Sequence, residues 1–564
     1  MKLVATPLAV LCAAILSMPA YAAKPAKAPK APKTPLFETK RLSEEVKILS
    51  SDEFEGRGPA TAGEKKTIDY LIAQFKAAGV QPGGDLKDGK RLWTQAVPLL
   101  RSDISGTPSL SVSVKKKARP LTQGNEIAVR AALDGSKAVN IKNAPLVFAG
   151  YGVSAPERQW DDFKGVDLKG KIAVVLINDP DFEAGAGPFG GKAMTYYGRW
   201  TYKFEEAARR GALGLLIVHE TDPASYGWNT VKNSNTNTMF DVVRDNPGGS
   251  HPSLEGWIQR DTAVSLFKSA GLDFEKLKKQ AQTREFKPVL LKNVTFSANY
   301  NVASEVITSQ NVVARVEGSK RADETVIYSA HWDHLGIGQP DAKGDTIYNG
   351  AVDNATGIAS LIEMSRAFAK AKKPLRSVVF LAVTAEEKGL LGSEYYSAKP
   401  LYPLAKTVAV INTDAFDPGG ISRDFTTSGS AKQELLDELI ATAQKWNVVY
   451  TPDPVPEAGH FFRSDHFPFA KRGVPAVSIG SGEDKVDGGV AAGKAEADAY
   501  IRDRYHQPAD QWEASWSFQG IARDLQIIYT LGSDLANSNR WPNWAADSEF
   551  RAARDESAEQ RAAK

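Results

Sequence analysis

The chain has 564 residues, of which 42% are hydrophobic, and a formal net charge of +3 at pH 7. Five lysines and no acidic residue precede residue 37, so the remainder carries a net charge of −2, which does not suggest a nucleic-acid-binding protein. Domains usually have roughly 100–200 residues, so this length predicts two large units, each able to bury a core.

The N-terminal residues 1–22 have the parts of a secretory signal: a lysine at position 2, an apolar run, and Ala20-Tyr21-Ala22 before a cleavage point. We therefore expect cleavage near Ala22 and export to the periplasm or the medium. The sole cysteine, Cys12, lies within this signal, so the mature chain is predicted to have no disulfide. Residues 23–36 are rich in lysine and proline and predict an extended linker. No later stretch of about 18 uncharged apolar residues predicts a transmembrane helix.

The next region, residues 126–299, contains short apolar runs that predict buried strands. They are Ala144 to Tyr151, Gly170 to Asn178 and Leu213 to His219, with a helical pattern over Tyr202 to Arg210 between the last two. Because Gly, Asn, Ser and Thr are frequent in the loops of this region, we interpret it as a compact β-rich module.

From Val312 onward, apolar β-branched runs alternate with helical segments, a pattern that predicts an α/β fold with helices on both faces of a β-sheet. The helix predicted over Ile521 to Leu535 has its apolar residues on one stripe and closes this unit. Residues 546–564 form a charged, alanine-rich tail.

Side chains that bind metals follow the predicted strands of this α/β unit. His331, the pair Glu386-Glu387 and Asp414 each follow an apolar run, and ligands of open α/β sheets lie beyond the carboxyl ends of the strands. Asp353 lies in a glycine-containing loop before a helix, and His506 lies in a proline-containing loop. Taken singly, each could be a helix cap, a turn residue or a solvated side chain. Together, imidazoles and carboxylates form a set that suits zinc and also cobalt or manganese.

Four motifs occur in the order found in a known enzyme family. The sequence is similar to the zinc aminopeptidases of peptidase family M28 in SAHWDHLG at 329–336, NGAVDNATG at 349–357, TAEEKGLLGS at 384–393 and NTD at 412–414. The similarity assigns residues 300–545 to a metallopeptidase catalytic domain and residues 37–125 to its N-terminal part. Residues 126–299 resemble a protease-associated domain, which is a common insert in this family. The implied fold is an α/β mixed sheet flanked by helices, interrupted by this insert.

The resemblance also implies a ligand set and a reaction. Two zinc ions per chain, or other first-row divalent ions, would be bridged by Asp353. His331 and Asp414 would complete one site, and Glu387 and His506 the other. The substrates would be peptides that lose their N-terminal residue.

The roles of further residues follow from the same resemblance. Glu386 would be the general base, and Asp333 would orient the His331 imidazole. His334 and His466 lie in family-like contexts and are expected to shape the wall of the site. His460 is a candidate for the substrate pocket, together with Phe461, Phe462 and Phe467, and Asp465 is a candidate pocket acid.

Three alternatives remain open from the sequence. A carboxypeptidase would need a cationic pocket for the substrate carboxylate, and Arg463 and Arg504 lie near the motifs. A glutaminyl cyclase of the same fold would use one metal, whereas the loop with the bridging acid is intact here. A non-catalytic binding protein would have replaced ligands, but all five are present. No G-x-S-x-G or P-loop motif supports a serine hydrolase or a nucleotide enzyme, and nothing in the sequence specifies an oligomeric state.

Overall fold

The computed structural model describes residues 36–429 and 431–562. The predicted signal and nearly all of the linker lie outside the described residues. Within the described ranges, no helix has both the length and the hydrophobicity needed to cross a bilayer.

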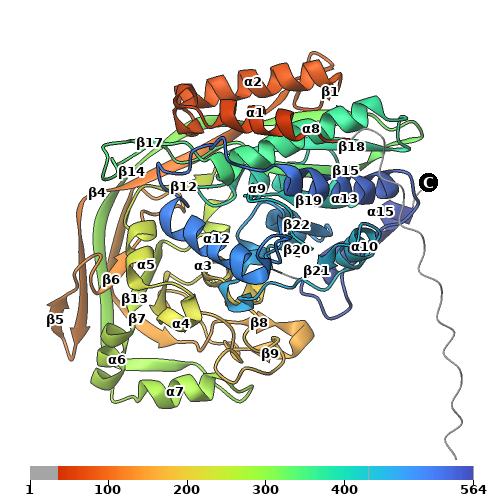
Figure 1. The fold of residues 1–564 in the computed structure, drawn as a ribbon. Helices are drawn as coiled ribbons and strands as arrows, with labels where there is room; N and C mark the ends of the chain where they lie inside the picture. The colour runs from red at the N-terminus through yellow and green to blue at the C-terminus, as the bar shows by residue number, and fades with distance from the viewer. Residues whose placement is uncertain (1–35, 430, 563–564) are drawn as a thin grey trace, which may run out of the picture.

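A mixed β-sheet of 16 strands extends through the whole described structure (Figure 1). Its main path has the order β21-β20-β22-β19-β15-β18-β14-β7-β10-β11-β13-β6, and β14 is the strand at which the two halves meet. The half that contains the predicted metal ligands, called the catalytic half after the sequence-based expectation, has the strands β15 (Arg321–His331), β18 (Arg376–Val383), β19 (Thr407–Thr413), β20 (Asp424–Thr427), β21 (Val449–Tyr450) and β22 (Ala476–Ser481). In this half β18, β15, β19 and β22 are parallel to one another, and β14 is antiparallel to β18. Strand β20 is antiparallel to β22 and parallel to β21.

Helices cover both faces of the catalytic half, as the alternation of strands and helices predicts. Tyr328 on β15 packs into the core of one face and donates a hydrogen bond to the carbonyl of Ile528 at 2.8 Å. The neighbouring Ile327 points to the opposite face and belongs to the same core as Tyr396 and Phe469, whose ring centroids lie 5.6 Å apart. Because side chains alternate along a strand, each strand supplies both cores. The predicted α/β class is confirmed.

The N-terminal segment packs onto the catalytic half. Its helices α1 (Thr39–Leu49) and α2 (Ala62–Ala78) contact α8 (Thr356–Lys370), as Figure 1 shows at the top of the view. Thr61 caps α2 by accepting a hydrogen bond from the Glu64 N–H at 3.5 Å, and Gly79 ends the helix in the left-handed conformation.

The remaining helices are shared between the two halves. The predicted insert, residues 126–299, contains α3 (Trp200–Arg209), α4 (Thr221–Ala224), α5 (Trp228–Asn235), α6 (Arg260–Ser269) and α7 (Phe274–Ala281). The catalytic half contains α9 (Leu391–Ala398), α10 (Glu434–Gln444), α11 (Phe467–Lys471), α12 (Gly489–Asp503), α13 (Gln519–Ala536), α14 (Arg551–Glu556) and α15 (Ala558–Ala562).

Two long antiparallel strands connect the halves. Strand β4 (Thr94–Val114) pairs with β14 (Val289–Val316) from Thr94 opposite Val312 to Val114 opposite Val294. Strand β14 therefore continues across the predicted boundary between residues 299 and 300, with a shift in its register against β4 between Asn299 and Asn301. The insert and the catalytic half share one sheet, which holds the insert in place beside the catalytic strands.

The insert has parallel strands at its centre. They are β7 (Ala138–Phe148), β10 (Ile172–Leu176), β11 (Gly214–His219) and β13 (Leu254–Gln259), with the antiparallel edge strand β6 (Ile127–Val129). Strands β5 (Lys117–Pro120) and β12 (Met239–Val242) pair with β4. Side chains of α3 and α5 pack on one face of the parallel strands and those of α6 and α7 on the other, so the structure adds helices to the predicted β-rich module.

Candidate active site

The predicted ligands converge at one edge of the catalytic sheet. Strands β15, β18 and β19 are parallel, so their carboxyl ends lie side by side. His331 is the last residue of β15, Glu387 lies in the turn after β18, and Asp414 directly follows β19. Asp353 lies in the turn that precedes α8, and His506 follows α12. The structure thus brings all five predicted ligands together from positions 175 residues apart in the sequence.

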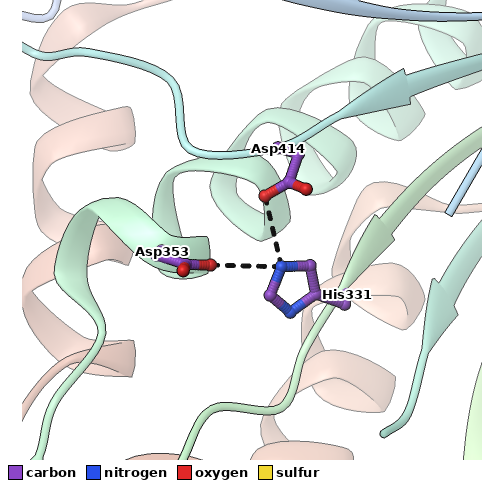
Figure 2. A group of neighbouring side chains, drawn as sticks. All are labelled: His331, Asp353 and Asp414. Carbon is purple, nitrogen blue, oxygen red and sulfur yellow. Dashed lines mark hydrogen bonds and ion pairs between the residues drawn. The ribbon is translucent and has the colours of Figure 1, made fainter. Parts of the chain in front are cut away.

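His331 contacts two carboxylates through one nitrogen (Figure 2). Its Nε2 lies 3.2 Å from Oδ1 of Asp353 and 3.2 Å from Oδ1 of Asp414. The imidazole is buried, and one ligand atom from each of the three residues lies within 4.8 Å of the others. This group matches the first predicted site.

Asp353 also faces a second group of ligands with its other oxygen. Oδ2 of Asp353 lies 3.4 Å from Nε2 of His506, and the same nitrogen lies 3.2 Å from Oε2 of Glu387. The two oxygens of one carboxylate are therefore directed at two separate sets of donors. This is the arrangement that a bridging ligand between two cations requires.

The structure places His334 beside this second group, where the sequence suggested a residue of the wall. Its Nδ1 lies 2.6 Å from Oε1 of Glu387, and His334, Asp353 and Glu387 offer ligand atoms within 4.8 Å of one another. Within the described ranges, the buried Nε2 of His334 has no hydrogen-bond partner, and the contact between Nδ1 of His334 and Oε1 of Glu387, both buried, does not have the geometry of a hydrogen bond. Buried polar atoms usually have partners, so these atoms are arranged for a group such as a cation.

The turn after β18 is held by Asp333. Its carboxylate accepts hydrogen bonds from the backbone N–H of Glu386 at 3.1 Å and of Glu387 at 3.4 Å. The nearest Asp333 atom to Nδ1 of His331 is the backbone carbonyl oxygen, at 3.1 Å, whereas the carboxylate is 3.8 Å away. Asp333 thus contacts the His331 imidazole, as expected from the sequence, but through its main-chain carbonyl. Its carboxylate instead positions the Glu386-Glu387 turn.

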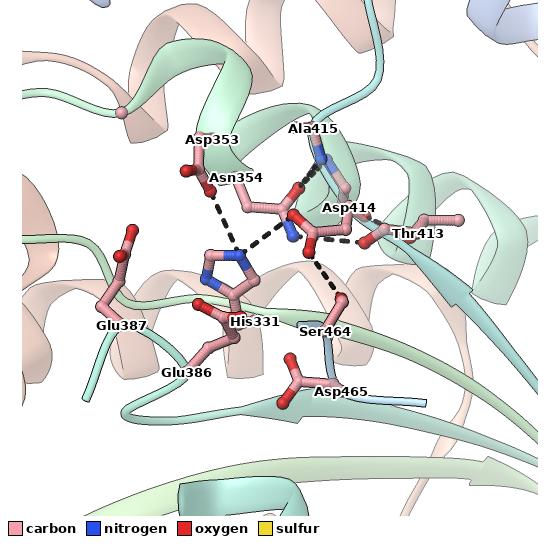
Figure 3. Close-up of polar contacts among 12 residues, drawn as sticks. His331, Asp353, Asn354, Glu386, Glu387, Thr413, Asp414, Ala415, Ser464 and Asp465 are labelled. Carbon is pink, nitrogen blue, oxygen red and sulfur yellow. Dashed lines mark hydrogen bonds and ion pairs between the residues drawn. The ribbon is translucent and has the colours of Figure 1, made fainter. Parts of the chain in front are cut away.

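Asp414 is oriented by Ser464, whose hydrogen bond to the Asp414 carboxylate is drawn in Figure 3. Ser464 donates a hydrogen bond to Oδ2 of Asp414 at 2.5 Å, and Asn412 donates to Oγ of Ser464 at 2.8 Å. The neighbouring Asp465 accepts a hydrogen bond from Ser393 at 2.6 Å and is buried close to Glu386. Burial raises the pKa of Asp465 to about 7.

Two buried residues that sequence reasoning missed hold the loops of the site. The guanidinium of Arg57 donates hydrogen bonds to the carbonyls of Trp332 at 2.9 Å, Asn349 at 2.6 Å and Gly350 at 2.8 Å, so it connects the His331 loop to the Asp353 loop. Arg57 lies within residues 37–125, which the resemblance assigned to the N-terminal part of the peptidase domain without a role for any single residue. A buried guanidinium that donates to several carbonyls cannot be identified from a single arginine in a sequence.

The second missed residue is Asp510, which holds the turn that carries Asp353. Its carboxylate accepts hydrogen bonds from the backbone N–H groups of Val352 and Asp353, at 3.1 Å in both cases. Gly350 enters this turn with φ +56°, and a Cβ atom there would lie 2.3 Å from the Asp353 carbonyl oxygen. The glycine in the sequence motif is therefore required by its positive φ and by the close approach of the chain.

The carboxylates of the site give it an excess of negative charge. Burial lowers the pKa of His506, but Asp353 and Glu387 raise it more, to about 10. Burial and Asp353 raise the pKa of Glu387, yet the imidazoles of His334 and His506 lower it to about 2. Burial also raises the pKa of Glu386 well above its usual range, an effect that His331 opposes. Clustered imidazoles and carboxylates with surplus negative charge fit divalent cations such as zinc.

A cavity of about 330 Å³ opens between this group and the insert. Glu386, Glu387, Tyr505 and His506 line it from the catalytic side, and Arg199 and Trp200 from the insert. Of the predicted pocket aromatics, Phe462 and Phe467 line the cavity. His460 is instead bonded through Nδ1 to Asp453 at 2.8 Å, and the ring of Phe461 packs on the buried His466 at 4.7 Å. Arg463 lines the cavity, whereas Arg504 forms an ion pair with Glu513 away from it.

The sequence of the catalytic half matches a known family. Residues 311–528 fit the sequence model of Peptidase family M28. This stretch is an M28 peptidase domain. The M28 domain contains His331, Asp353, Glu387, Asp414 and His506, so every predicted ligand lies inside the matched range.

Individual relatives of the M28 domain include aminopeptidases and metalloproteases. The chain is 34% identical over 320 residues to Aminopeptidase NAALADL1 of Rattus norvegicus, an alignment that covers 48% of this chain and 38% of the relative. It is 36% identical over 103 residues to a probable zinc metalloprotease of Pyrenophora teres, with coverage of 18% and 22%. The chain thus spans well under half the length of these relatives. The solved aminopeptidase from Aneurinibacillus sp. strain AM-1 is 18% identical, with a TM-score of 0.48, and the alignment covers 89% of this chain and 95% of that one.

Proposed function

We propose that this protein is a zinc-dependent aminopeptidase that removes N-terminal residues from peptides with the help of two metal ions. The observation that carries the proposal is the position of Asp353, whose Oδ1 faces His331 and whose Oδ2 faces His506. A carboxylate shared between two donor groups supports two adjacent cations. The intact set of ligands favours an enzyme over a binding protein that has lost its metals.

The ligands divide into two sets that share Asp353. His331 and Asp414 complete one set, and Glu387 and His506 complete the other. When bound, a pair of divalent cations polarises the scissile carbonyl and lowers the pKa of a water molecule. The imidazole of His334 also lies beside the second set, so His334 and His506 are both candidates for its histidine ligand. The metal content of the variants His334→Ala and His506→Ala decides between them.

Glu386 is proposed as the general base. It is half-buried, lines the cavity and does not belong to either set of ligands. Because burial raises its pKa, the carboxylate takes up a proton readily. The same group can return this proton to the departing amine. Asp333 positions Glu386 by accepting the hydrogen bond from its backbone N–H.

The size of the cavity favours action on the end of a peptide. A volume of about 330 Å³ is at the lower end of the range for small-molecule sites. The proposed protease-associated insert, residues 126–299, closes one side of this cavity and would exclude a folded protein chain. We further propose that the N-terminal signal directs export, so that the enzyme meets peptides outside the cytoplasm.

The deciding experiment uses the purified mature protein with unblocked and N-acetylated peptides, before and after chelation. Release of N-terminal amino acids from unblocked peptides alone, lost on chelation and restored by zinc, is the expected result. Release of C-terminal residues from the acetylated peptides would identify a carboxypeptidase. The absence of hydrolysis together with the absence of bound metal would identify a binding protein.

A further inference from the structure

The wall of the cavity that the insert contributes contains a buried arginine without a counter-ion. Arg199 is 9% exposed and lines the cavity, and in the described part of the chain no carboxylate forms an ion pair or hydrogen bond with its guanidinium. Its buried Nε has no hydrogen-bond partner. Burial lowers the pKa of Arg199 to about 10, so the side chain remains charged at neutral pH. An unpaired buried charge is costly, which indicates that a ligand supplies the missing partner.

The catalytic half contributes a second arginine to the wall of the cavity. Arg463 is exposed, lines the same cavity and is close enough to Arg199 to lower its pKa further. No carboxylate among residues 36–429 and 431–562 pairs with Arg463 either. Two arginines that line the same cavity and have no acidic partner in the described part of the structure create a positive potential there.

The start of helix α3 adds to this potential. Arg199 is the N-cap residue of α3, and the first helical residues, Trp200 and Thr201, also line the cavity. No side chain caps the helix, so the free N–H groups of its first turn lack a side-chain acceptor. A helix N-terminus with free amides attracts anions, and here a buried arginine occupies the same position.

The acids that line this part of the cavity are already neutralised. Glu255 pairs with Arg130 at 2.7 Å, and Asp241 pairs with Arg244 at 2.7 Å. Glu205 pairs with Lys471, and Glu394 pairs with Arg472. The cavity is therefore cationic at the insert and acidic at the metal ligands, which orients a zwitterionic substrate. A substrate amino group is attracted to the acidic end, and a carboxylate to the arginines.

We propose that Arg199, Arg463 and the N-terminus of α3 form a subsite for the C-terminal carboxylate of a short peptide, on the leaving side of the scissile bond. The inference rests on the proposed aminopeptidase function and narrows its substrates to dipeptides and tripeptides with a free C-terminus. The insert then contributes directly to substrate binding. An acidic side chain in the leaving fragment would offer a carboxylate to the same subsite. The experiment below distinguishes this side-chain carboxylate from the C-terminal carboxylate.

The experiment compares three substrates of the zinc-loaded enzyme: alanyl-alanine, alanyl-alaninamide and the α-amide of alanyl-aspartic acid. Loss of a charged hydrogen-bond donor weakens binding by a factor of about 10 to 100. Arg199→Gln is therefore expected to raise KM for alanyl-alanine by this factor. The kcat/KM for alanyl-alaninamide is expected to change by less than about twofold. Arg463→Gln, at an exposed position that tolerates substitution, is expected to raise the same KM by a smaller factor. Arg260→Gln, an exposed arginine of the insert on α6, is the control and leaves all three substrates unchanged.

The outcomes are distinct. If Arg199→Gln and Arg463→Gln change hydrolysis of the free acid and of its amide by the same factor, the carboxylate subsite is wrong while the aminopeptidase function stands. A loss confined to the aspartyl amide would overturn the C-terminal assignment in favour of an acidic side chain. If the zinc-loaded wild type hydrolyses none of the three substrates, the proposed function itself fails.

Discussion

The carboxylate of Asp510 accepts a hydrogen bond from the backbone N–H of Asp353 at 3.1 Å, although the two residues are 157 positions apart in the sequence. Asp510 also follows the His506 loop, so one residue connects the proposed bridging ligand to a ligand of the second set. Arg57 supports the same turn from the other side through the carbonyl of Gly350. The position of Asp353 thus depends on groups that do not touch the substrate.

We predict that Asp510→Asn lowers zinc affinity, because an amide accepts fewer hydrogen bonds from the Asp353 turn. Loss of a group that orients a metal ligand typically costs about 10- to 100-fold in affinity. Zinc titration of the apoprotein measures the effect. Asp503→Asn, at an exposed position at the end of α12, serves as the matched control. Equal affinities for the two variants would show that Asp510 does not position the ligand.

Glu386→Gln is expected to remove most turnover and leave the metal content normal. The amide keeps the hydrogen bond between the backbone N–H and Asp333 but cannot accept a proton, and a general base contributes typically about 10²- to 10⁴-fold. Steady-state hydrolysis of an unblocked peptide and metal analysis of the same sample test both statements. Full activity in this variant would refute the role of Glu386.

Asp353→Ala is expected to reduce the occupancy of both proposed metal positions, since its two oxygens face two different sets of donors. His506→Ala should reduce the occupancy of one position only. Metal content per chain after dialysis distinguishes these variants. If His334→Ala loses metal and His506→Ala retains it, the ligand of the second set is His334.

A pH dependence of stability is predicted for the ion network that joins the insert to the catalytic half. His251 lies between Asp241 and Glu255, at 3.0 Å and 2.7 Å, and Arg244 connects Asp241 to Glu394 on α9. Burial lowers the pKa of His251, but Glu255 and Asp241 raise it to about 9. Since the folded pKa lies above the unfolded value, this stabilisation is complete below about pH 6.5 and is lost as the pH rises through about 9.

The measurement compares thermal midpoints of the wild type and His251→Asn between pH 6 and pH 10. Arg244 and Arg130 also face Asp241 and Glu255 and remain charged throughout this range. The wild type is expected to be more stable at pH 6, with a difference of roughly 3 kcal/mol at most, and the difference should vanish near pH 10. A difference that stays constant across the range would show that the charge of His251 contributes nothing.

The sequence by itself determined the α/β class and identified the candidate ligands of the proposed metal centre. Apolar β-branched runs identified β15, β18 and β19, and the positions of His331, Glu387 and Asp414 after these runs placed them at one edge of the sheet. This inference succeeds because parallel strands align their carboxyl ends, so local periodicity specifies where a side chain lies in the fold. The order of the motifs added Asp353 and His506 through resemblance.

Only the tertiary structure decided which groups surround these ligands. The contacts of Arg57 and Asp510 join segments far apart in the chain, and the same local sequence around His334 suits a wall residue as well as a ligand. Likewise, the sequence put both Arg463 and Arg504 forward for a cationic pocket, yet Arg463 lines the cavity and Arg504 pairs with Glu513. Arg199 became significant because the long strands β4 and β14 place the insert opposite the metal ligands. Such long-range proximity depends on packing between elements, which the spacing of residues along one chain does not encode.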